Sequence, residues 1–168
     1  MGLHVYQIGI RLVAAIEELL TDIATEEAGD ATLARASQLP QVEFGKVQAD
    51  DDGMMDVEEG IKVSPLSPRQ AGGTNERDDV AYRFLIVIGY GSWTETIPIN
   101  WPTGFYEQAI RQRFHHRRIG SLGLLDSWEI RCMVEPGDLP DIPKIRQGVD
   151  ATTLVLSSFI RETRRIPN

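Results

Sequence analysis

The chain has 168 residues, of which 42% are hydrophobic and 25% charged, and its formal net charge is −8. This length and composition fit one globular domain and argue against a disordered or fibrous chain. The negative charge disfavours sequence-specific DNA binding, and the sequence has neither a membrane-spanning apolar run nor a signal peptide. We therefore expect a single domain over 1–168, folded in the cytoplasm, with no membrane contact.

The N-terminal third predicts a helix followed by a polar arm. Apolar residues recur at three- and four-residue steps over 5–23, the pattern of an amphipathic helix. Turn-forming and acidic residues dominate 28–58, with one short strand expected at 42–47. Such a long excursion is typical of a functional arm. Residues 1–60 also contain 13 acidic and 3 basic side chains, so the acidity belongs to this end.

The middle of the chain predicts two strands joined by a hairpin. A short strand at 61–63 is terminated by Pro65, and a longer strand at 82–90 is apolar on both faces, as in the centre of a sheet. The segment 66–79 between them is polar and rich in turn residues, so we expect a mobile hairpin tip without regular structure. We predict that this tip is an assembly arm, and its candidate contact residues are Gln70, Gly72, Gly73, Asn75, Glu76 and Arg77.

The C-terminal half predicts a helix at 103–118, capped by Thr103, and strands at 128–134 and 152–162. Paired strands separated by a helix favour an α+β fold: a mixed or antiparallel four-stranded sheet with two helices packed on it and long polar loops. The only cysteine, Cys132, is expected to be a buried thiol. The predicted core consists of Leu12, Ile16, Leu19, Phe84, Ile86, Ile88, Ile110, Phe114, Ile130, Val134, Leu154 and Leu156.

No residue pattern predicts an active site. Adjacent His115 and His116 lack the spacing of a metal-binding helical pair, and no nucleophile motif is present. Residues 48–59 partly match a calcium loop through Asp50, Asp52 and Glu59, but the first position is not acidic and no helix precedes it. We expect no enzyme activity, no cofactor and no metal, and keep a small calcium-binding or hydrolytic module as an alternative.

Basic residues gather at two places, Arg117 and Arg118 near the end of the second helix and Arg164 and Arg165 at the chain end. These side chains are either ordinary solvated surface or a basic interface that meets the acidic arm of a neighbouring copy. The sequence leaves both readings open.

The order of elements resembles that of a known family. An amphipathic helix is followed by the strand "IKVSP", the polar loop "LSPRQAGGTNERDD", the strand "YRFLIVIGYG", a helix, and the final strand "TTLVLSSFIRETRR". This arrangement, with its charged ending Arg161, Glu162 and Arg164, resembles the tail-terminator and head-to-tail joining (neck) proteins of long-tailed bacteriophages. The resemblance covers 5–25 and 60–165.

This resemblance implies a structural virion protein, assembled in the host cytoplasm, that forms a ring of commonly six subunits at the head-proximal end of the tail. The ring would stop polymerisation of the tail tube protein and join the tail to the head connector. DNA would pass through without specific binding, so we expect Asp50, Asp51, Asp52 and Asp56 to face the lumen or an interface. A head-completion or neck protein nearer the portal is the alternative within this class.

Overall fold

The computed structural model describes residues 2–26, 41–45, 60–74, 76–90, 101–137 and 150–163. These ranges form an α+β fold with more strands than the four expected from the sequence. The elements in chain order are α1 (Gly2–Glu26), β1 (Val42–Phe44), β2 (Gly60–Pro65), β3 (Arg69–Gly73), β4 (Arg77–Tyr90), α2 (Trp101–Phe114), β5 (Ser127–Pro136) and β6 (Asp150–Thr163).

The six strands form one open sheet built around β4 and β6. These two strands pair antiparallel along all 14 of their residues, from Arg77 opposite Thr163 to Tyr90 opposite Asp150. β5 pairs with the other edge of β6, while β3 and β2 pair with successive parts of β4. All pairings are antiparallel except that of β1 with β2. The prediction that 82–90 forms a central strand is therefore confirmed.

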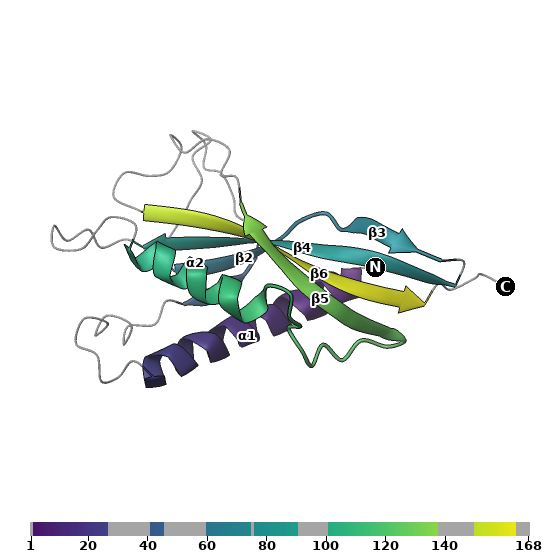
Figure 1. The fold of residues 1–168 in the computed structure, drawn as a ribbon, viewed down its shortest axis with the longest axis horizontal. Helices are drawn as coiled ribbons and strands as arrows, with labels where there is room; N and C mark the ends of the chain where they lie inside the picture. Colours follow the sequence, from purple (N-terminus) through teal and green to yellow (C-terminus); the bar gives the residue numbers. More distant parts are fainter. Residues whose placement is uncertain are drawn as a thin grey trace.

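Both helices lie on the same side of the sheet (Figure 1). The core fills the space between them and one sheet face, where Leu12 and Ile16 of α1 and Ile110 and Phe114 of α2 are fully buried. Ten of the twelve predicted core residues are buried, and Leu19 packs against the core while remaining partly exposed. The helical periodicity predicted this packing because only one stripe of each helix is apolar.

α1 is confirmed and extends beyond the predicted 5–23 at both ends. It approaches β1 closely at Gly9, where an added Cβ would lie 2.2 Å from the ring of Phe44. Glycine is thus required by the packing of helix against strand at this position. None of the described helices is long and apolar enough to cross a membrane.

The prediction for α2 was wrong at both ends. The helix begins at Trp101, two residues before the expected cap Thr103, and it ends at Phe114 instead of 118. The chain leaves the helix because His116 adopts a left-handed conformation with φ of 60°, and the backbone then pairs with Cys132. Arg117 and Arg118 consequently lie in and just after the turn that follows the helix, beside β5, and not on the helix.

The predicted mobile tip at 66–79 was also wrong, because most of it is paired. β3 occupies Arg69–Gly73, and β4 begins at Arg77, eight residues after the start of β3. The sequence concealed this pairing because β3 has no apolar face: all five of its residues are exposed. Polar backbone can pair in an edge strand without burying side chains.

β5 contains a bulge that changes which residues face the core. The register with β6 shifts between Glu129 and Arg131, so simple alternation fails there. As a result Glu129 is buried at 7% exposure, whereas the predicted core residue Ile130 is only half-buried. Cys132 and Val134, beyond the bulge, are buried as predicted.

Candidate functional site

Polar side chains gather at the end of the sheet formed by the β3–β4 hairpin. The start of α1 and the end of β6 lie at this same end (Figure 1). We call it the hairpin end. An open hollow of about 530 Å³ lies here, lined by Gly73, Thr74, Glu76, Arg77, Asp79 and Arg161. Three of the six predicted hairpin contact residues, Gly73, Glu76 and Arg77, line this hollow.

Asp79 and Arg161 form a forked ion pair beside the hollow. They stand opposite each other on β4 and β6. Arg161 donates from Nε to Oδ1 of Asp79 at 2.7 Å and from a terminal nitrogen to Oδ2 at 2.9 Å. These hydrogen bonds hold the pKa of the Asp79 carboxyl below its usual value. The fork fixes both charges in one geometry, which favours recognition of a partner over general attraction.

A second arginine, Arg77, stacks on an aromatic ring. Its guanidinium carbon lies 4.9 Å from the ring centroid of Trp128, which is 42% exposed. Tryptophan and arginine are the residues most enriched at energetically important positions of protein interfaces. Strict alternation from the buried Cys132 and Val134 would place Trp128 on the core face, but the bulge between Glu129 and Arg131 leaves this ring at the surface.

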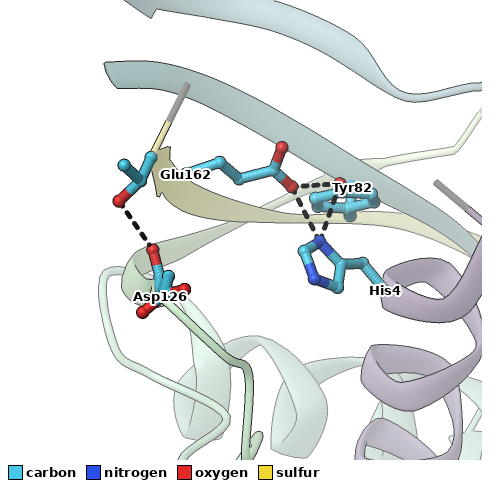
Figure 2. A network of polar contacts seen from close by, with 5 residues as sticks. His4, Tyr82, Asp126 and Glu162 are labelled. Carbon is cyan, nitrogen blue, oxygen red and sulfur yellow. Dashed lines mark hydrogen bonds and ion pairs between the residues drawn. The ribbon is translucent and has the colours of Figure 1, made fainter. Parts of the chain in front are cut away.

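Figure 2 shows a polar network that ties α1 to the hairpin end. A single oxygen of Glu162 on β6 accepts hydrogen bonds from the hydroxyl of Tyr82 on β4 and from Nδ1 of His4, the latter at 2.9 Å. Burial raises the pKa of Tyr82, as do the hydrogen bond to Glu162 and its charge. The phenol is therefore a proton donor at neutral pH and not a base. The network is well suited to anchor the first turn of α1.

The loop before β5 is fixed to β6 at the same end. Thr163 donates its hydroxyl proton to the carbonyl oxygen of Asp126 at 3.0 Å (Figure 2), and Asp126 itself has a left-handed φ of 54°. Leu125 beside it is 81% exposed. Leu125 thus adds one apolar side chain to the exposed surface of the hairpin end.

The buried carboxylate of Glu129 lies deeper in the molecule, where its hydrogen bonds have a structural role. One oxygen accepts from the Ile119 N–H at 2.7 Å, the Cys132 thiol at 3.2 Å and the Ser158 hydroxyl at 3.3 Å. The other accepts from the Gly120 N–H at 3.0 Å. Burial, followed by the charge of Glu129, raises the pKa of the Cys132 thiol, which therefore stays protonated. Four donors satisfy this carboxylate, so it fastens the loop after α2 to the sheet.

Of the predicted basic interface, the structure describes Arg117 and Arg118. Arg117 and Arg118 are exposed beside β5, where Nε of Arg118 donates to the Ile130 carbonyl at 3.3 Å. The candidate residues Asp50, Asp51, Asp52, Asp56, Asn75, Arg164 and Arg165, together with the calcium-loop residue Glu59, lie outside the described residues. Among the described residues, no group of three or more His, Cys, Asp or Glu could hold a metal ion.

Trp128 and Asp79 at the hairpin end were not among the predicted site residues, although Arg161 belongs to the charged ending that carries the family resemblance. The sequence contains only a weak signal for this site. Arg77, Asp78 and Asp79 place charges at the start of a strand whose continuation is apolar. No protein-family model matches this sequence, and a search of curated proteins finds no match. The role of the site must therefore be inferred from its own residues.

Proposed function

We propose that this chain is a non-enzymatic structural protein that forms a homo-oligomeric ring, commonly of six subunits, at the head-proximal end of a phage tail. In this role it ends polymerisation of the tail tube and joins the tail to the head connector. The observation that supports the proposal most is the hairpin end. There an exposed polar hairpin, a stacked Arg77–Trp128 pair and the exposed Leu125 lie on a framework anchored by hydrogen bonds.

The chemistry of this end favours protein contacts over catalysis. Several of its ionisable groups are engaged with one another: Asp79 with Arg161, and Glu162 with Tyr82 and His4. Its exposed groups are those that interfaces use, namely tryptophan, arginine and leucine. Closed rings of more than two subunits require unlike patches to meet, so one copy of the chain must offer two different surfaces.

Two features of the sequence supplement this proposal. The exposed Arg117 and Arg118 supply a basic surface for a neighbouring subunit, together with Arg164 and Arg165. The acidic residues 50–52 and 56 keep the lumen repulsive to DNA, because a basic wall would bind the phosphate backbone strongly. We therefore expect that duplex DNA passes through the ring and is not retained at physiological salt. A neck protein nearer the portal would share these properties.

Electron microscopy of the purified protein tests the ring directly. We expect annular particles whose symmetry gives the subunit number, and tail tube protein polymerised in their presence should form tubes capped at one end. Isolated globules at all concentrations, and tubes of unchanged length, would contradict the proposal.

Deletion of Gln70–Glu76 tests the hairpin. The deletion removes most of β3, whose residues are all exposed. Because Arg69 stands opposite Ala81, the first residues of β4 must leave the sheet to rejoin Arg69, while the rest of β4 stays paired with β6. We expect a folded chain and a loss of rings in sedimentation velocity. The expectation that the hairpin serves assembly and not folding is wrong if the variant unfolds, or if it still assembles normally.

A further inference from the structure

The two faces of the sheet differ in what covers them. Phe84 and Leu156 stand opposite each other and belong to the core beneath the helices. Their chain neighbours Leu85 and Val155 also pair, but they point to the opposite face because side chains alternate along a strand. We call this opposite side the outer face. None of the described helices packs on it, since α1 and α2 share the other side (Figure 1).

The outer face is partly apolar. Ala81, Val87 and Thr153 are buried on this face, but Leu85, Val155, Phe159 and Met133 are only half-buried, and Trp128 is exposed. None of these residues packs against the core cluster. Leu85 and Val155 pair directly, while Met133 stands opposite Ser157, Phe159 opposite Arg131 and Trp128 opposite Arg161. Apolar and polar side chains therefore alternate across β4, β6 and β5, a mixed surface of the kind that protein interfaces use.

The outer face also carries an excess of positive charge among the described residues. Its carboxylates are Glu43, Asp79 and Glu135, and its cations are Lys62, Arg69, Arg77, Arg83, Arg131 and Arg161. Glu43 stands opposite Lys62, and Asp79 is paired with Arg161. Arg83 and Arg131 lie near the middle of the face, where their cross-strand neighbours on β6 are the uncharged Ser157 and Phe159. A fitting partner is therefore both apolar and acidic.

The exposed face of α1 has this chemistry. Tyr6 and Ile10, one helical turn apart, are 59% and 44% exposed. Glu17 lies on the same side of the helix, and Glu18 and Asp22 follow Ile10 at four-residue steps through Ala14; all three acidic residues are exposed, and Glu18 pairs with Arg11. The exposed side of α1 faces away from the core, although the ring of Tyr6 contacts Phe44 of β1. It can therefore meet the outer face only of a second copy.

We propose that the outer face of one copy docks on the exposed face of α1 of the next copy, with Arg83 and Arg131 facing Glu17 and Asp22. The contact joins two unlike surfaces, so it propagates head to tail and can close into a ring. This inference rests on the proposed ring, for which it supplies the two surfaces. A duplex DNA partner is disfavoured, because the apolar side chains of the outer face have no counterpart on a phosphate backbone.

Charge reversal with complementary mixing tests the proposal. The sheet variant is Arg83→Glu with Arg131→Glu, and the helix variant is Glu17→Lys with Asp22→Lys. Each should raise the concentration at which half of the chain is assembled by about tenfold or more, measured by light scattering after size exclusion, because like charges then face each other. An equimolar mixture should assemble near the wild-type concentration, since every contact in an alternating ring again pairs opposite charges.

Gln108→Glu, at an exposed position of α2, provides a control for the change in charge and should assemble as the wild type does. Variants that assemble normally, or a mixture that fails to assemble although each variant is folded by circular dichroism, would overturn the docking faces and leave the ring intact. A wild-type chain that stays monomeric at every concentration would instead overturn the ring and the docking together. Retention of duplex DNA at about 0.15 M salt, abolished in the sheet variant without a change in assembly, would assign the outer face to nucleic acid.

Discussion

Phe84 and Leu85 are chain neighbours on the central strand, yet they face different surroundings. Phe84 is fully buried between the sheet and the helices, while Leu85 is half-buried on the outer face. The same contrast holds across β6 for Leu156 and Val155. An apolar residue in a strand therefore does not by itself indicate core packing. The sheet face beneath the helices stabilises the monomer, and the outer face has apolar surface left for an additional contact.

The largest expected effect comes from truncating a side chain on the sheet face beneath the helices. Phe84→Ala should lower the free energy of unfolding by about 3–5 kcal/mol, because it removes a buried ring and leaves a cavity. Leu85→Ala, the matched change on the outer face, should cost about 1 kcal/mol in the isolated chain, because its side chain is only partly removed from water. Urea unfolding of both variants measures the difference. Equal losses would mean that the two faces are packed alike.

Removal of the buried carboxylate should have the next largest effect. Glu129→Ala leaves the Ile119 and Gly120 N–H groups and the Ser158 hydroxyl without their acceptor, which should cost about 2–3 kcal/mol in chemical unfolding. Glu135→Ala, on the exposed side of the same strand, should change stability by less than about 0.5 kcal/mol. An unchanged free energy of unfolding in Glu129→Ala would show that the bulge, and not the carboxylate, positions the loop.

The polar network at the hairpin end should give a smaller effect that depends on pH. The pKa of Tyr82 is raised in the folded state, so its contribution is present below pH about 10 and is lost as the pH rises above that value. Tyr82→Phe should cost about 1 kcal/mol at pH 7 and weaken the alkaline loss of stability. Cys132, whose pKa is also raised, contributes to the alkaline loss of stability in the wild type and in Tyr82→Phe alike. Thermal unfolding between pH 7 and 11 measures this difference. Parallel curves would exclude Tyr82 as a source of the alkaline loss.

The smallest effect is expected at the surface ion pair. The pKa of Asp79 is lowered by Arg161, so the contribution of this pair is present above pH about 4 and is lost as the pH falls. Asp79→Asn should lower the unfolding midpoint slightly at low salt and leave it unchanged at about 1 M salt, because exposed charges are screened. A large effect that persists in high salt would indicate that the pair is more shielded from solvent than its exposure suggests.

Much of the fold was predictable from local patterns. The helical stripe of α1 and the alternation in β4 and β6 identify nearly all core positions, since burial imposes those periods on the sequence. The polar character of 66–79 indicated a hairpin, but its pairing as β3 left no periodic signal because none of its residues is buried. The end of α2 was misplaced because nothing in the composition of Phe114–Arg118 marks the left-handed turn at His116.

The sequence by itself determined the fold class, the helical packing stripes and the absence of a recognisable catalytic motif, because these depend on neighbours along the chain. Only the tertiary structure decided that Glu129 is buried and Trp128 exposed, since one extra residue at a bulge reverses the alternation. It also brought His4, Tyr82 and Glu162 together from separations of 78 and 80 residues. Contacts between distant residues depend on strand register, and register is set by the packing of the whole sheet and not by any local segment.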